Sequence, residues 1–208
     1  MDVWIMRDQG SARDRAATAF RDCGGTLRMS EALKRGVSRH TLYSMVADGT
    51  LERLSRGVYR LAELDPLANP DLVTVARRIP GGVICLISAL AFHRLTTQIP
   101  HVVWVAVRRG VWEPWLDWPP IRIMEFGEQA HRAGIEVHEL DGVPVRVYSP
   151  EKTLADHFKY RNRIGLDIAL EGLRLYIERG HPKVEDLLAM ARVCRVERVM
   201  TPYLEALL

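Results

Sequence analysis

The chain has 208 residues, of which 48% are apolar and 26% charged, and its formal net charge is +3. This balance is ordinary for a soluble globular protein of one large or two small domains. No apolar run is long enough for a membrane span or a signal peptide, so we expect a cytoplasmic protein. The three cysteines, Cys23, Cys85 and Cys194, lack the paired spacing of zinc or redox sites and fit buried thiols in a reducing compartment.

The first ten residues show no clear pattern, and the first helix is expected over residues 11–23. Its apolar stripe recurs at helical spacing and consists of Ala16, Ala19, Phe20 and Cys23. The dipeptide Gly24-Gly25 follows directly and would end the helix.

A short helix, a turn and a second helix follow between Leu27 and Gly49. The short helix is indicated by apolar residues at helical spacing, namely Leu27, Met29, Ala32 and Leu33. Gly36 and Val37 supply the turn. Ser38 would cap the second helix by accepting a backbone N–H, and Gly49 stands where that helix would stop.

The polar face of this second helix carries hydrogen-bond donors and mixed donor-acceptors. Its residues are Ser38, Arg39, His40, Thr41, Tyr43 and Ser44. Such side chains contact base edges and phosphates when a recognition helix enters the major groove of DNA. We therefore expect this face to bind duplex DNA.

A two-stranded wing is predicted over residues 51–61, where side chains alternate about the turn Ser55-Arg56-Gly57. The wing residues expected at the DNA are Arg53, Ser55, Arg56 and Arg60, whose arginines are spaced to reach phosphates. Residues 28–60 hold seven basic and three acidic side chains, so the positive charge of the chain is concentrated there. The alternative is a winged helix that only packs against a neighbour, with the arginines as a solvated face.

The proline-interrupted segment 62–72 predicts a boundary between a winged helix-turn-helix domain, residues 1–65, and a second domain, residues 70–208. The second domain mixes helical and strand periods. Its expected strands are residues 101–107 and 121–126 and a hairpin turning at Asp141-Gly142. Its expected helices are residues 72–79, 86–95, 150–159, 166–178, 184–193 and 196–207. This predicts an α+β fold with a mainly antiparallel sheet and C-terminal helices.

Catalytic and metal motifs are missing: the sequence has no phosphate loop, dinucleotide fingerprint or zinc-protease spacing, so we expect no enzyme and no cofactor. A Gly-Gly pair before Ser88 resembles a nucleotidyltransferase opening, but no Asp-x-Asp pair follows to hold magnesium. His131 and His138 lie near two glutamates, and we expect surface histidines there rather than a metal cluster. His93 is expected to be a satisfied, semi-buried histidine.

Two further groups of side chains leave alternatives open. Lys152, Asp156 and Lys159 share one helical face, which is either solvated with an i, i+4 ion pair or an anion- or partner-binding surface. A tryptophan cluster is expected to cover one end of the sheet, and its exposure would instead mark an interface. Its members are Trp112, Trp115 and Trp118.

The segments VICLISALAFHRLTTQIPHVVWVAV and GVPVRVYSPEKTLADHFKYRNRIGLDIALEGLRLYI resemble the second domain of bacterial AbiEi-type antitoxins. The resemblance covers about residues 11–195. It implies a transcriptional regulator of a phage-defence locus that represses its own operon by binding inverted repeats, often paired with a nucleotidyltransferase-like AbiEii toxin. It also implies that residues 38–60 carry the DNA-binding role, while SPEKTLAD and RNRIGLD mark the family without a role that we can assign.

The sequence thus predicts an autorepressor and antitoxin of a type IV toxin-antitoxin operon, without enzymatic activity. Its expected partners are double-stranded DNA, a toxin encoded nearby and a second copy of the chain on DNA. A solitary winged-helix transcription factor is the alternative within the same class. An enzyme acting on nucleotides or RNA through the second domain is the alternative from another class.

Overall fold

The computed structural model describes residues 3–110 and 115–208, with side chains described from Ala12 onward. The chain divides into two units, each described by itself. Unit 1 comprises Met1–Pro80, Leu116–Pro119 and Glu139–Val145, and unit 2 comprises Gly81–Trp115, Pro120–His138 and Arg146–Leu208. Among the described residues, no helix combines the length and apolar character that crossing a membrane requires.

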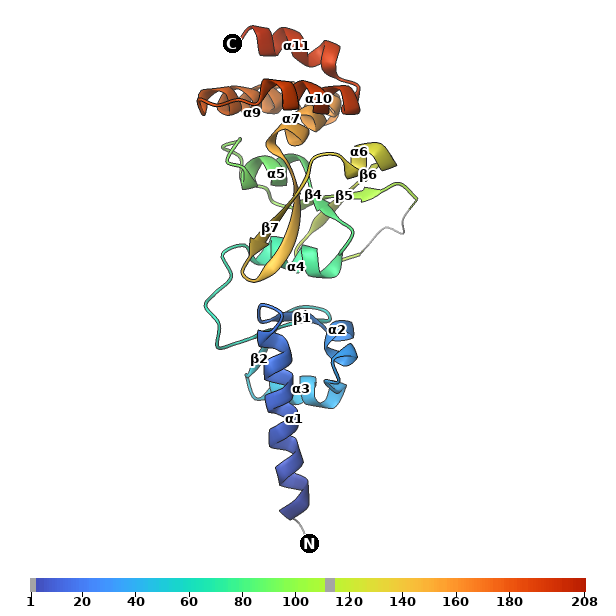
Figure 1. Ribbon diagram of the computed structural model, residues 1–208, viewed down its shortest axis with the longest axis vertical. Helices are drawn as coiled ribbons and strands as arrows, with labels where there is room; N and C mark the ends of the chain where they lie inside the picture. Colours follow the sequence, from blue (N-terminus) through green and yellow to red (C-terminus); the bar gives the residue numbers. More distant parts are fainter. Residues whose placement is uncertain (1–2, 111–114) are drawn as a thin grey trace. The chain divides into compact units, whose positions relative to one another are not determined.

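Unit 1 contains a winged helix-turn-helix (Figure 1). Its elements in chain order are α1 (Val3–Arg21), β1 (Thr26–Arg28), α2 (Met29–Lys34), α3 (Arg39–Ala47), β2 (Leu51–Ser55), β3 (Val58–Leu61) and α4 (Pro70–Arg78). The strands form one antiparallel sheet in the order β1-β3-β2. The second helix and the wing are confirmed where the sequence places them.

Two details of this unit differ from the prediction. Helix α1 begins at Val3 instead of residue 11. Leu27 belongs to strand β1, where it faces Tyr59 of β3, so the short helix begins only at Met29. A strand of three residues is too short to show its own period, which is why Leu27 fits the helical spacing equally well.

The core of unit 1 fixes α3 against α1 and the wing. Its buried apolar residues are Ala16, Phe20, Leu27, Ala32, Val37, Leu42, Met45, Leu51, Tyr59 and Leu61. The predicted inner stripe of α1 is therefore confirmed at Ala16 and Phe20, and Ala19 and Cys23 pack at its edge, half-buried. Because Leu42 and Met45 point inward, the opposite face of α3 must point to solvent.

Unit 2 is built on a mixed sheet with helices, and the α+β class is confirmed. Its elements are β4 (Val83–Ile84), α5 (Leu86–Phe92), β5 (Val103–Arg108), β6 (Ile121–Phe126), α6 (Glu128–Arg132), β7 (Ile135–Leu140), β8 (Val143–Tyr148), α7 (Pro150–Lys159), α8 (Arg161–Ile164), α9 (Leu166–Glu178), α10 (Val184–Cys194) and α11 (Glu197–Glu205). The turn between β7 and β8, whose tip belongs to unit 1, has positive φ at Asp141 and Gly142, as expected of a tight hairpin.

The sheet order is β6-β5-β4-β8-β7. Strands β5 and β6 pair in parallel, as do β4 and β8, while β4 and β5 are antiparallel. Parallel strand pairs therefore make up more of this sheet than the prediction of a mainly antiparallel sheet allowed. The alternation of side chains along a strand reports which face is buried and says nothing about the direction of its neighbour.

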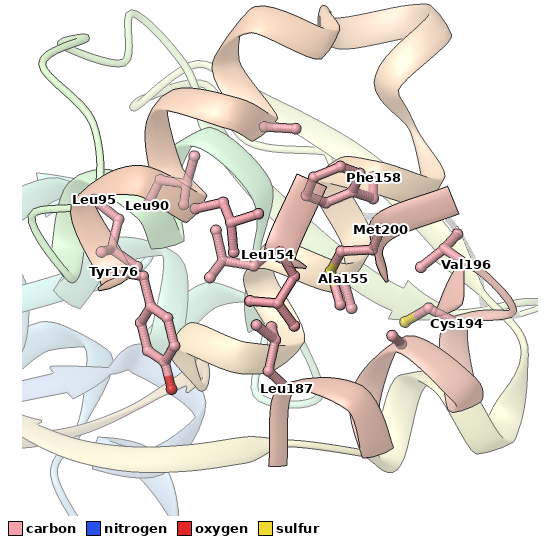
Figure 2. Close-up of a cluster of buried hydrophobic side chains, with 14 of the residues drawn as sticks. Leu90, Leu95, Leu154, Ala155, Phe158, Tyr176, Leu187, Cys194, Val196 and Met200 are labelled. Atoms are coloured by element: carbon pink, nitrogen blue, oxygen red, sulfur yellow. The ribbon is translucent and has the colours of Figure 1, made fainter. Parts of the chain in front are cut away.

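The C-terminal helices form a second core around α7 (Figure 2). Leu154, Ala155 and Phe158 of α7 meet residues of α5, α9, α10 and α11, and Figure 1 shows α7 between the sheet and the pair α9 and α10. Cys194 is buried in this core and Cys85 in the sheet layer, so both are buried thiols as expected, while Cys23 is half-buried.

His157, on the same helix, makes the stability of unit 2 depend on pH. Its Nδ1 lies 2.8 Å from the carbonyl oxygen of Thr153, while Nε2 is buried without a partner among the described side chains. Burial lowers the pKa of His157 to about 4. The unfolded chain takes up this proton near pH 6.5 and the folded chain only near pH 4, so stability is lost as the pH falls between these values.

We therefore expect His157→Asn, which keeps a donor toward the Thr153 carbonyl, to flatten the dependence of the melting temperature on pH between 7 and 5. Half-buried His93 and buried His131 also have lowered pKa values, so a weaker dependence of the same sign remains. Thermal unfolding at several pH values in wild type and variant measures the difference. An identical slope in both proteins would mean that His157 takes up no extra proton on unfolding.

Candidate nucleic-acid interface

Helix α3 is held at its start by the side chain of Ser38. The Ser38 Oγ accepts the backbone N–H of Thr41 at 3.0 Å and lies 2.8 Å from the Thr41 hydroxyl oxygen. This bond satisfies one of the free N–H groups of the first turn, as the sequence predicts. Ser38 and Thr41 therefore stabilise the first turn of α3, the helix that carries the candidate contacts.

The exposed face of α3 presents Arg39, His40 and Tyr43, and Tyr43 is 55% exposed. Arg39 makes no ion pair with any described side chain. An exposed guanidinium, an imidazole and a phenol on one helical face can donate to base edges and phosphates without breaking an internal bond. This face therefore has the chemistry predicted for it.

Ser44, by contrast, is half-buried and already engaged. Arg13 of α1 donates a hydrogen bond to its Oγ and forms an ion pair with Asp48 at 3.1 Å. Hydrogen bonds from Thr50 lower the pKa of Asp48, with a smaller contribution from Arg13, so Asp48 is ionised. Arg13 thus ties α1 to the end of α3. Sequence analysis missed this residue because the 31 positions that separate it from Ser44 leave no local pattern.

The wing places Arg53 and Arg56 in solvent. Arg53 donates from Nε to the carbonyl oxygen of Ser55 at 3.3 Å. Arg56 stands in the turn before Gly57, whose φ of +78° suits a glycine. Both arginines can therefore reach phosphates beside a groove occupied by α3.

Arg60 and Ser55 are buried, so their prediction as DNA contacts is wrong. Arg60 is 5% exposed, and its guanidinium donates to the carbonyl oxygens of Leu64 at 3.2 Å and Asp65 at 2.5 Å. Ser55 is 6% exposed and cannot reach a ligand. Strand β3 is central because β1 covers its second edge, and a bulge between Arg53 and Ser55 turns Ser55 inward. The sequence analysis lacked both β1 and the bulge.

In unit 2, the prediction that Lys152 and Asp156 lie on a solvated face of α7 is wrong. Lys152 and Asp156 are both 0% exposed and form an ion pair at 2.5 Å, while Lys159 is exposed. The Lys152 Nζ lies 4.2 Å from the ring centre of Tyr148 and 4.7 Å from that of Phe126. Cys194 donates from Sγ to Asp156 at 3.2 Å. No exposed anion site exists at the pair, because the protein interior encloses it.

The histidines divide between buried and half-exposed positions. His93 is semi-buried with Nε2 2.7 Å from the Tyr148 carbonyl oxygen, as predicted. His131 is buried, which corrects the expectation of a surface histidine, and burial lowers its pKa. His138 is half-buried and lies 2.9 Å from Glu136. Within residues 3–110 and 115–208, no group of three or more His, Cys, Asp or Glu side chains could hold a metal ion.

Trp115 and Trp118 differ from the expectation that they cover one end of the sheet. Trp115 and Trp118 are 63% and 61% exposed, and Trp112 lies outside the described residues. From the sequence, we expect exposed tryptophans at this position to mark an interface, whereas buried ones would cover the sheet.

Comparison with known proteins agrees with this geometry. Residues 14–62 match the family model described as "Transcriptional regulator, AbiEi antitoxin". The crystal structure of the RV2827C protein from Mycobacterium tuberculosis is similar in fold, with a TM-score of 0.50 and 13% sequence identity over 94% of this chain and 81% of that chain. No curated protein matches the chain.

Proposed function

We propose that this protein binds DNA and represses its own operon, because its winged-helix segment, residues 14–62, matches the model of the AbiEi antitoxin family of transcriptional regulators. The observation that carries the proposal is the exposed polar face of α3 beside the arginines of the wing. Of the ten predicted contact residues, those that stand exposed are Ser38, Arg39, His40, Tyr43, Arg53 and Arg56. DNA in the cytoplasm is the partner that these donors and cations fit.

The arrangement supports a division of labour between helix and wing. Arg39 on α3 can make a bidentate contact with a guanine, and Tyr43 beside it offers a hydroxyl and an apolar ring edge to neighbouring bases. Arg53 and Arg56 are placed to bind phosphates, which adds affinity without sequence information. A winged helix of this kind reads only a short half-site.

We propose that two copies bind an inverted repeat in the promoter of the protein's own operon. A single module of this size buries too little surface for the selectivity that a genome demands, whereas two linked modules multiply discrimination. Unit 2 would then join the copies, counter a nucleotidyltransferase-like toxin encoded nearby, or do both. A toxin partner distinguishes an antitoxin from a solitary regulator.

We propose further that unit 2 acts by binding and not by catalysis. Its most chemically capable cluster, Lys152 with Asp156 and Cys194, is enclosed in the core, where no substrate can reach it. Incubation of the purified protein with labelled nucleoside triphosphates, magnesium and RNA should leave both unaltered. Turnover that depends on residues of unit 2 would contradict this part of the proposal.

Footprinting of the full chain on its own promoter tests operator binding. We expect two protected half-sites related by an inverted repeat and spaced by about one helical turn or a multiple of it. The stoichiometry should be two chains per operator. One protected half-site with one bound chain would contradict paired binding.

Neutralising the wing tip should weaken binding to every DNA sequence. Arg56→Ala removes one phosphate contact, so the slope of log K against log salt should become shallower by about one unit. Binding to operator and to random duplexes, measured by fluorescence anisotropy across a salt series, gives this slope. Arg174→Ala, which removes an exposed charge from α9 in unit 2, is the matched control and should leave the slope unchanged. Equal slopes for Arg56→Ala and wild type would show that the wing tip does not contact a phosphate.

A further inference from the structure

Helix α4 is bonded to the turn of the wing. Arg78, at the end of α4, donates from a terminal guanidinium nitrogen to the carbonyl oxygen of Arg56 at 2.7 Å. Residues 56 and 78 both belong to unit 1. The carbonyl that Arg78 binds is thus part of the residue whose side chain we assign to a phosphate.

The next carbonyl of the same turn is also held. The backbone N–H of Met29, at the start of α2, donates to the carbonyl oxygen of Gly57 at 2.8 Å. The turn is therefore fastened from two directions, by α2 through Gly57 and by α4 through Arg56. A wing tip is ordinarily among the most mobile parts of such a domain, because few buried contacts restrain a hairpin turn.

Arg77, the neighbour of Arg78, anchors α4 itself. Its guanidinium donates to the carbonyl oxygen of Cys23 at 2.9 Å and lies 3.7 Å from the carboxylate of Glu31. Glu31 in turn accepts the backbone N–H of Arg28 at 3.0 Å, at the start of α2. These bonds fix α4 to the segment that joins α1 and α2, so Arg78 reaches the wing from a fixed base.

We propose that Arg78 is a positioning residue for DNA binding: it holds the wing turn so that the Arg56 side chain is presented to a phosphate. This inference rests on the proposed function. The nitrogen of Arg78 that faces the wing is bonded to a carbonyl, and its Nε is buried. Its contribution therefore passes through Arg56. The DNA-binding unit accordingly includes α4, which the predicted domain of residues 1–65 would omit.

Hydrogen exchange in the full chain without DNA tests the clamp directly. We expect Arg78→Ala to accelerate amide exchange in segment 54–58 while the core of α1 stays protected. Arg78→Lys keeps the charge and one donor toward the carbonyl and should restore much of the protection. Arg174→Ala, with the same change of charge, should exchange as wild type. Unchanged exchange of segment 54–58 in Arg78→Ala would overturn the clamp.

Operator affinity in a double-mutant cycle tests the effect on binding. Arg78→Ala should lower the affinity about fivefold, the scale of coupling between residues in contact. In the Arg56→Ala background the same change should cost less than about twofold, since the side chain that it positions is gone. Additive losses would overturn the proposal and make Arg78 a contact of its own, and so would an unaltered affinity. If the wild type binds no DNA, the proposed function fails, while the exchange measurement still decides the clamp.

Discussion

Lys152→Met is expected to lower the free energy of unfolding by about 3–5 kcal/mol, the range for removing one partner of a buried ion pair. The lysine and Asp156 are both fully buried, with 2.5 Å between the ammonium nitrogen and the carboxylate oxygen. Burial raises the pKa of Asp156, and Lys152 is the main group that opposes this shift. Without the ammonium, the carboxylate must either stay ionised in the core or take up a proton.

The surroundings of the pair explain why the loss cannot be repaired locally. The ammonium faces the rings of Tyr148 and Phe126, and these rings stack on one another with centres 5.7 Å apart. Among the described residues, the side chain besides Lys152 that donates to Asp156 is that of Cys194, a weak donor. Lys159 also lowers the pKa of Asp156, but by less than Lys152 does, so it replaces only part of the lost charge.

Chemical denaturation of three variants measures this effect. Lys152→Met should show the predicted loss in the free energy of unfolding. Lys152→Met combined with Asp156→Leu should recover much of that loss, because no buried charge is left unpaired. Arg192→Met is the matched control: it breaks an exposed pair with Glu197 at 2.8 Å and should cost about 1 kcal/mol or less. Equal losses for Lys152→Met and Arg192→Met would show that the buried pair carries no special weight.

Arg39→Ala is expected to weaken operator binding by about 1–3 kcal/mol and binding to random duplexes much less. Arg39 stands exposed in the first turn of α3, where recognition helices contact bases. A bidentate contact with guanine is lost only on the operator. The phosphates, which dominate binding to random DNA, remain available to Arg53 and Arg56.

Arg39→Lys separates base reading from charge. Lysine keeps the positive charge but lacks the planar pair of donors, so it should retain affinity for random DNA and lose much of the preference for the operator. Anisotropy titrations of operator and random duplexes at one salt concentration give both quantities. If Arg39→Ala loses equal affinity for the two duplexes, Arg39 contacts a phosphate and the base-reading role passes elsewhere on α3.

The winged helix could be predicted because its signals are local. The cap at Ser38, the helical spacing of Leu42 and Met45, and the turn at Arg56-Gly57 each depend on neighbours within a few positions. Recognising these signals requires no knowledge of which distant segments pack against them. The exposed part of the candidate interface follows from them.

The parts that escaped prediction depend on contacts between distant segments. Arg60 is predicted to contact a phosphate because alternation along β3 gives no sign that β1, which lies far earlier in the chain, covers the other edge of β3. Lys152 and Asp156 have the spacing of a solvated helical pair, and only the packing of α7 among the sheet and C-terminal helices buries them. Arg13 bonds to the end of α3 and Arg78 bonds to the wing turn. No local sequence pattern predicts either contact.

Genome-wide immunoprecipitation of the tagged full chain tests the central claim most directly. If the protein is an autorepressor that reads an inverted repeat through α3, its strongest peak should lie at its own promoter and should be reduced in Arg39→Ala. A protein expressed at the wild-type level that shows no enrichment at its own promoter would contradict the account.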